Sequence, residues 1–172
     1  MSTALARARE LALRFRTRTK TVVLGTTSPD GIPDASVAPA VLGEDGAIYV
    51  YISGLAAHTR NLAATRRASL LLLEDESATT QLLARRRLTF PATAALVSRE
   101  GAECDGIIAG FREKFGAPIG LLSTMRDFQI FRLTLQPGRL VAGFGEAYTV
   151  DPLDWTNLDP VGPRPAGSAD PR

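Results

Sequence analysis

The sequence has few of the residues on which several common classes of protein depend. Among its 172 residues there are one cysteine, Cys104, and one histidine, His58. A single cysteine excludes an intramolecular disulfide and fits a reducing compartment, and one histidine without a cysteine cluster makes no metal-ligand set. No apolar run approaches the roughly 20 residues that a membrane helix needs. We therefore expect a cytoplasmic protein with no membrane span and no metal-ion site.

An excess of one charge is also lacking. The chain has 20 Lys and Arg against 18 Asp and Glu, for a net charge of +2, so a nucleic-acid partner is not expected. No nucleophile-elbow motif is visible, which argues against a hydrolase, and no catalytic acid or base is predicted. A hydrophobic content of 45% and a charged content of 22% are ordinary for a globular protein, and this length can bury a sizeable core.

Many short strand patterns, separated by tight turns, make up most of the chain. Asp-Gly turns at 28–33 and 43–46 predict hairpins. Strands are expected at 20–27, 34–42, 47–53, 68–75, 87–98, 128–135 and 139–144, and helices at 2–17, 102–115 and 118–125. There are no internal repeats and no alternation of strand and helix. The pattern favours an antiparallel barrel with helical additions.

The C-terminal segment has a different composition. Residues 151–172 are rich in proline, glycine and aspartate, with few apolar side chains to offset the entropy of ordering. We expect a barrel domain over 1–150 with an N-terminal helix, followed by a tail over 151–172 that folding does not require. Trp155 is the one residue of this segment that could anchor it, either on the barrel or on a partner chain.

Residues 49–76 contain the most informative pattern, which is a strand, a glycine turn, a short helix and a second strand. The pattern places Ser53, His58, Thr59 and Arg60 around the start of the short helix. Because a helix start has unpaired N–H groups and a partial positive charge, it favours an anion such as a phosphate or a carboxylate. The sequence therefore predicts an anion-binding part of a cofactor site here.

Several motifs together resemble a known family. ISGLAAHTRNL, LLLLEDES, ARRRLTF, MRDFQIFRL and GRLVAGFGEAY occur in the order found in pyridoxamine-phosphate-oxidase-like split barrels, and they are most similar to the heme-utilisation branch, the HugZ/HutZ-like proteins. The resemblance covers most of the chain before the C-terminal segment. It implies a mainly β, six-stranded antiparallel split barrel, a homodimer, and a cofactor at the dimer interface.

The resemblance offers two cofactors. Flavin-binding members often place an arginine on the second strand and a lysine near the helix start, where this chain has Ser36 and His58. An FMN phosphate would then depend on Ser36, Ser53, Thr59, helix N–H groups and Arg60. FMN binding with a possible redox role is the leading expectation, heme binding or degradation is the alternative, and a cofactor-free dimeric binding module is a third.

Other residues leave alternatives open. Heme-binding members use a C-terminal histidine as iron ligand, whereas the C-terminal segment here has none, so His58 is the only imidazole that could reach a heme iron. His58 could equally cap a helix or pair across a dimer. Arg85 and Arg87 form a cationic cluster with Arg86 that is either a solvated run or a contact to phosphate or propionate. Asp127 matches a position that supports the ligand histidine in heme-binding relatives.

Overall fold

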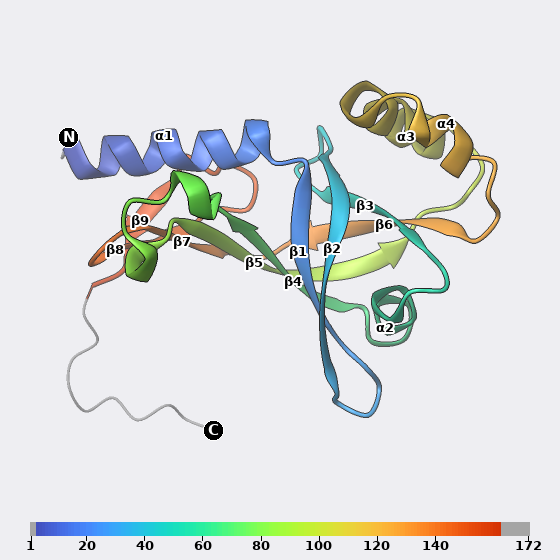
Figure 1. The fold of residues 1–172 in the computed structure, drawn as a ribbon, viewed down its shortest axis with the longest axis horizontal. Coiled ribbons are helices and arrows are strands. Elements are labelled where there is room, and N and C mark those ends of the chain that lie inside the picture. Colours follow the sequence, from blue (N-terminus) through green and yellow to red (C-terminus); the bar gives the residue numbers. More distant parts are fainter. Residues whose placement is uncertain (1–2, 163–172) are drawn as a thin grey trace.

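The computed structural model describes residues 3–162, which form one continuous antiparallel sheet with helices around it (Figure 1). Six strands close a barrel in the order β4-β1-β2-β3-β6-β5, because β5 pairs with β4 again, and β7, β8 and β9 extend the sheet beyond β5. The elements are α1 (Thr3–Arg18), β1 (Thr21–Thr27), β2 (Pro33–Leu42), β3 (Ile48–Ser53), α2 (Ala57–Thr65), β4 (Arg67–Leu73), η1 (Glu76–Ala78), η2 (Leu82–Ala84), β5 (Arg87–Leu96), α3 (Ala102–Phe115), α4 (Pro118–Leu122), β6 (Phe128–Leu135), β7 (Gly138–Gly143), β8 (Glu146–Val150) and β9 (Leu158–Pro160). The predicted six-stranded antiparallel barrel with helical additions is confirmed.

The hairpin turns form where the Asp-Gly pairs predict them. Gly31 and Gly46 have φ values of +83° and +79°, a left-handed conformation that glycine adopts without the steric cost of a Cβ. The seven predicted strands and four predicted helices, including the short helix within 49–76, are all present, with ends that differ by a few residues where ends were predicted. The strands β8 and β9 and the 3-10 turns η1 and η2 were not predicted.

The barrel interior is apolar because inward side chains alternate along each strand. Val22 and Leu24 of β1 and Leu70 and Leu72 of β4 are buried in one core. Leu62 of α2 is fully buried in the same core. The short helix is therefore fixed against the barrel through the face that carries Leu62.

The helices α3 and α4 cover the outer side of β3 and β6, on the opposite part of the molecule from α1 (Figure 1). Tyr49 and Tyr51 of β3 point to this side and pack in a second core with Phe111 of α3 and Ile119 of α4. Because β3 faces one core on each side, it is buried along nearly its whole length, without the polar alternation of a strand with one solvated face.

The beginning of the C-terminal segment belongs to the core, which differs from the expected tail over 151–172. Trp155 is 2% exposed and its ring centroid lies 4.9 Å from that of Phe90. The Trp155 indole N–H donates to the carbonyl of Pro152, and Leu158 of β9 is buried where β9 pairs with β8. Residues 151–161 therefore pack as part of the fold, whereas residues 163–172 lie outside the described residues.

The composition of residues 151–162 does not reveal this packing, because hydrogen bonds to their main-chain carbonyls, and not only apolar side chains, hold the segment on the barrel. Arg9 of α1 donates to the carbonyl of Thr156 at 3.0 Å, and Arg16 donates to the carbonyl of Leu153 at 3.2 Å. The Arg16 guanidinium also lies 5.8 Å from the centre of the Trp155 ring, a cation–π distance. Two arginines of the first helix thus satisfy main-chain groups of a segment about 140 residues later.

Candidate functional site

The turn between β3 and α2 is built around one glycine. The N–H of Gly54 donates to the carbonyl of Asp127 at 2.6 Å, and a Cβ at position 54 would lie 2.9 Å from that oxygen. Ser53 donates through its hydroxyl to Asp127 Oδ2 at 3.0 Å and accepts from the N–H of Leu55 at 3.2 Å. Both roles of the Ser53 hydroxyl serve the turn, and Asp127 of the RDF motif is its partner.

The helix α2 begins at Ala57, with Ala56 as its N-cap and no side-chain cap hydrogen bond. The predicted helix start is therefore present, and His58, Thr59 and Arg60 lie in its first turn. Thr59 is buried and its hydroxyl donates to the carbonyl of Ser53 at 2.6 Å, which ties the helix to the end of β3.

Arg60 lies in the same turn of α2, but its side chain points toward the residues that precede the helix. Its Nη1 donates to the carbonyl of Leu55 at 2.7 Å, on the exposed surface. The arginine thus closes the turn before the helix, and part of its hydrogen-bonding capacity is used within the chain.

His58 and Ser36 form a pair between α2 and β2. The Ser36 Oγ lies 2.8 Å from His58 Nδ1, and both side chains are half-buried. Burial lowers the pKa of His58 below its ordinary value, and the negative charge of Asp34 opposes that shift. The two positions at which flavin-binding relatives often carry cations thus hold a neutral, mutually hydrogen-bonded pair at neutral pH.

Three buried polar side chains occur in the described range, and all lie where α2 meets the barrel: Thr26, Thr59 and Asn61. Asn61 Nδ2 donates to Thr26 Oγ1 at 3.0 Å. Because an unpaired polar group is costly in a core, this bond fixes the side of α2 on β1. The sequence analysis missed Thr26 and Asn61, although a polar residue directly before the buried Leu62 was a usable signal.

We expect Asn61→Ala to lower the free energy of unfolding by about 1–3 kcal/mol, since it leaves the buried Thr26 hydroxyl without its partner. Urea denaturation measures this change. The double variant Thr26→Val, Asn61→Leu should lose less than the sum of the single changes, because it removes both polar groups together. The exposed change Ala64→Ser on the same helix is the control. An Asn61→Ala variant as stable as the control would contradict a role for the bond.

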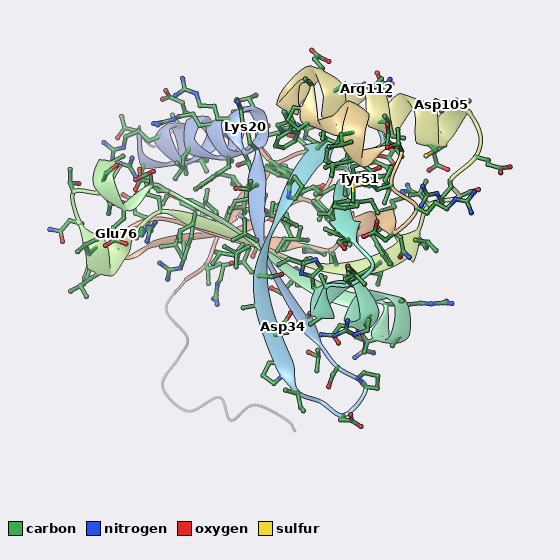
Figure 2. The ribbon with its side chains drawn as sticks, turned by 45° about the vertical axis from the view of Figure 1, so that its right-hand side comes forward. Lys20, Asp34, Tyr51, Glu76, Asp105 and Arg112 are labelled. Atoms are coloured by element: carbon green, nitrogen blue, oxygen red, sulfur yellow. The ribbon has the colours of Figure 1, made fainter. Side chains whose placement is uncertain are left out.

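A groove of about 640 Å³ opens between the β1–β2 hairpin and the start of β4, and Thr26, the partner of Asn61, is among its lining residues. It lies where β1 and β4 stop pairing, since the last pair is Gly25 with Ser69. Asp34, which acts electrostatically on His58, lines this groove opposite a strand that begins at Arg67. Figure 2 shows Asp34 on the hairpin that extends past α2. Asp34 and Arg67 are candidate site residues that the sequence analysis did not name.

Arg85 and Arg87 lie elsewhere. Along β4, Arg67 pairs with Thr93 at the end near α2, whereas Leu73 pairs with Arg87 at the other end. Six residues of strand separate the two ends, which is roughly 20 Å at about 3.3 Å per residue. In Figure 2 the neighbouring Glu76 lies at the left-hand end of the molecule, whereas Asp34 lies on the hairpin below its middle.

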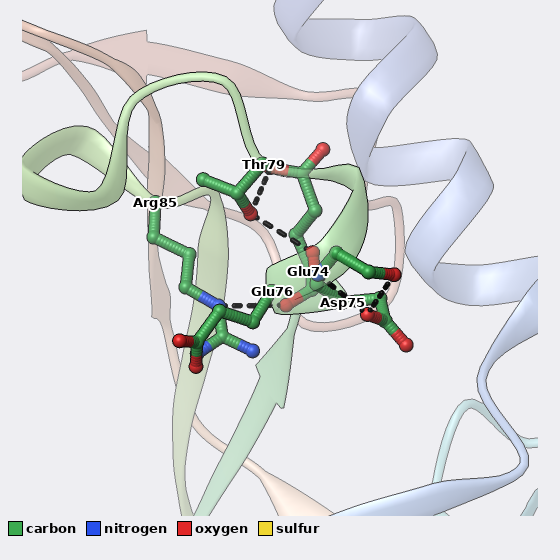
Figure 3. Close-up of polar contacts among 6 residues, drawn as sticks. Glu74, Asp75, Glu76, Thr79 and Arg85 are labelled. Atoms are coloured by element: carbon green, nitrogen blue, oxygen red, sulfur yellow. Dashed lines mark hydrogen bonds and ion pairs between the residues drawn. The ribbon is translucent and has the colours of Figure 1, made fainter.

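The arginine cluster is occupied by local partners (Figure 3). Arg85 Nε donates to the carbonyl of Glu74 at 2.8 Å, and its Nη1 lies 3.2 Å from Glu76 Oε2. Arg86 pairs with Glu74 Oε1 at 3.3 Å, and Arg87 donates to the carbonyl of Arg85. Within one chain the structure brings Ser36, Ser53, His58, Thr59 and Arg60 to one end of the barrel, but leaves Arg85 and Arg87 at the other.

The described residues set two further limits. Between residues 3 and 162, no three His, Cys, Asp or Glu side chains converge as ligands for a metal ion. None of the helices in that range is long and apolar enough to cross a membrane. The groups available at the α2 site are one imidazole, several hydroxyl groups, main-chain N–H groups and the charged side chains of Asp34, Arg60 and Arg67.

Comparisons with known proteins agree on one family. The family model for pyridoxamine 5'-phosphate oxidase matches residues 8–142. Heme oxygenase HutZ of Vibrio cholerae serotype O1 is 41% identical over 148 residues, which cover 84% of each chain. The crystal structure of HutZ, described as a heme storage protein, superposes with a TM-score of 0.72 at 39% identity over 76% of this chain and 91% of HutZ. A heme binding protein of Mycobacterium smegmatis gives a TM-score of 0.72 at 28% identity, over 91% of this chain and 61% of that protein.

Proposed function

Because the chain belongs to the pyridoxamine 5'-phosphate oxidase family, and within it to the HugZ/HutZ-like branch, we propose that it is a heme-binding protein of heme utilisation. The observation that carries this proposal is the 41% identity to HutZ over 84% of both chains. HutZ is described as a heme oxygenase and also as a heme storage protein, so heme binding is common to both descriptions.

The chemistry of the site at α2 supports heme over FMN. An FMN phosphate carries up to two negative charges and is best held by fixed cations as well as helix N–H groups. Here Ser36 and His58 form a neutral pair, and Arg60 is turned onto the carbonyl of Leu55. We therefore favour heme, the alternative from the sequence analysis, over FMN. A neutral imidazole can bind heme iron, whereas it adds no positive charge for a phosphate.

Hemin titration of the purified full-length chain tests this function. We expect a Soret band that saturates at one hemin per chain or per pair of chains, and no quenching of FMN fluorescence at the same protein concentration. Flavin bands in the purified protein, or saturable FMN binding without a Soret band, would restore the FMN hypothesis. If neither ligand binds, the chain is a cofactor-free binding module and the proposal is wrong.

Heme degradation is a separable part of the question. A reductant and oxygen added to the hemin complex should bleach the Soret band if the protein degrades heme as a heme oxygenase does. A stable Soret band under those conditions would identify binding without turnover. In either outcome heme is the ligand, and the enzyme class follows from the time course.

Assembly as a homodimer in the cytoplasm is part of this proposal. Ile32 and Val37 of the β1–β2 hairpin and Leu96 at the end of β5 are 60–65% exposed, and a second copy of the chain packed on them would bury this apolar surface. The single cysteine fits a reducing compartment. Sedimentation equilibrium at micromolar concentration, with and without hemin, should give twice the mass of one chain, and a monomer in both conditions would contradict the dimer.

A further inference from the structure

Resting on the proposed heme binding, we propose that His58 ligates the heme iron through Nε2 and that Ser36 is the positioning residue that holds its ring. The Ser36 hydroxyl lies 2.8 Å from Nδ1, and no other hydrogen bond to the ring occurs within residues 3–162. His58 is also the only histidine among the 172 residues. The arrangement leaves one ring nitrogen engaged and the other available.

The pairing suits an iron ligand for a chemical reason. A ligating imidazole must be neutral, with its lone pair on the nitrogen that faces the metal, and its other N–H is usually donated to a protein oxygen. A serine hydroxyl can accept such a bond. When Nδ1–H donates to Ser36 Oγ, the proton is absent from Nε2, which then has the lone pair that iron requires.

The other side chains able to ligate heme iron are placed less well. Besides histidine, heme iron in proteins is bound by cysteine thiolate, tyrosine or methionine. Cys104 is a buried residue of α3 in the second core, and Tyr148 is buried in the barrel core. Tyr49 and Tyr51 are buried with their hydroxyls donated to Asp45 and to the carbonyl of Leu122. Met125, the one methionine among residues 3–162, is 40% exposed in the segment before β6 and does not line the groove between the β1–β2 hairpin and β4. His58 is the half-buried donor on which Asp34, a lining residue of that groove, acts electrostatically.

The attachment of α2 to the barrel also suits a helix whose histidine must hold one orientation toward the iron. The helix is fixed to β1 by the Asn61–Thr26 bond and to the end of β3 by the Thr59–Ser53 bond. The adjacent groove of about 640 Å³ has Asp34 among its lining residues and Arg67 as its basic one. A cationic guanidinium is a suitable partner for a propionate carboxylate.

Spectroscopy of the hemin-loaded full-length chain tests the ligand. Resonance Raman of the ferrous complex should show an iron–imidazole stretching band in the wild type. His58→Ala should lose that band, shift the Soret maximum and bind hemin at least about tenfold more weakly. Added free imidazole should restore the spectrum of His58→Ala. Ala63→Ser, an exposed change on the same helix, should leave the band and the affinity unchanged.

The role of Ser36 has its own readout. Ser36→Ala should shift the iron–imidazole frequency, because the bond at Nδ1 sets the basicity of the ring, and should weaken hemin binding by about tenfold. Ser36→Thr keeps the hydroxyl and should restore the frequency. A purely structural serine would leave the frequency unchanged in every variant, and that result would overturn its positioning role.

The outcomes separate the two proposals. A wild type with no Soret band on hemin addition overturns the proposed function. A wild type that binds hemin but shows no iron–imidazole band, or a His58→Ala variant with an unchanged spectrum, leaves the function standing and overturns the assignment of the ligand. If His58→Ala fails to fold by circular dichroism, His58→Gln keeps a hydrogen-bonding group for Ser36 and removes the imidazole, and the same spectroscopic criterion then applies.

Discussion

Trp155→Ala is expected to lower the free energy of unfolding by about 3–5 kcal/mol, the cost typical of removing a large aromatic side chain from a core. The indole is 2% exposed, packs against the Phe90 ring at a tilt and lies under the Arg16 guanidinium. For a domain of this size, that loss corresponds to a decrease in Tm of roughly 6–20 °C. Differential scanning calorimetry of the wild type and the variant measures it.

A neighbour provides the control. Leu153 lies in the same segment but is 70% exposed, so Leu153→Ala should change stability by no more than about 0.5 kcal/mol. Truncation after Val150 removes Trp155 and the strand β9 together and should destabilise the protein at least as much as Trp155→Ala. A truncated chain with the wild-type Tm would show that residues 151–162 are dispensable, as their composition suggests.

Gly54→Ala is expected to lower stability by about 1–3 kcal/mol and to weaken hemin binding as well. An added Cβ would lie 2.9 Å from the carbonyl oxygen of Asp127, which also accepts the N–H of Gly54. The oxygen belongs to the main chain, so the turn must open to admit the methyl group. His58 follows four residues later, and its position on α2 would shift with the turn.

Another glycine separates this steric effect from the general effect of adding a methyl group. Gly110 lies within α3, where a Cβ would meet no atom within 4 Å, so Gly110→Ala should stabilise the helix by about 0.5–1 kcal/mol. Urea denaturation gives both changes in stability, and hemin titration gives the change in affinity. Gly54→Ala with wild-type stability and affinity would show that the turn relaxes freely and does not position α2.

Local signals predicted most of the fold. The two Asp-Gly turns define hairpins because glycine tolerates a positive φ, and Gly31 and Gly46 have that conformation. The apolar runs predicted strands, and helical spacing of apolar residues predicted the helix α3 over 102–115. The β8 and β9 strands escaped prediction because they are short, and β9 owes its position to pairing with β8.

For the candidate site, too, the sequence grouped residues that are close along the chain, and the structure decided where the distant ones lie. A strand followed by a glycine turn and a helix predicted that Ser53, His58, Thr59 and Arg60 share one end of the barrel, since they are close in sequence. The family resemblance added Ser36, and the structure pairs it with His58. Arg85 and Arg87 were grouped with them by charge, yet the register of β4 on β5 places them at the opposite end.

By itself the sequence determined the individual strands, the hairpins and the helix start at α2, because each depends on interactions between residues that are near neighbours along the chain. Only the tertiary structure decided which distant groups meet. The Ser36–His58 pair, the Ser53–Asp127 bond and the Trp155 contact with Phe90 join residues 22 to 74 positions apart. Such partners are set by strand register and by the need to satisfy buried polar groups, which no local pattern of residues specifies.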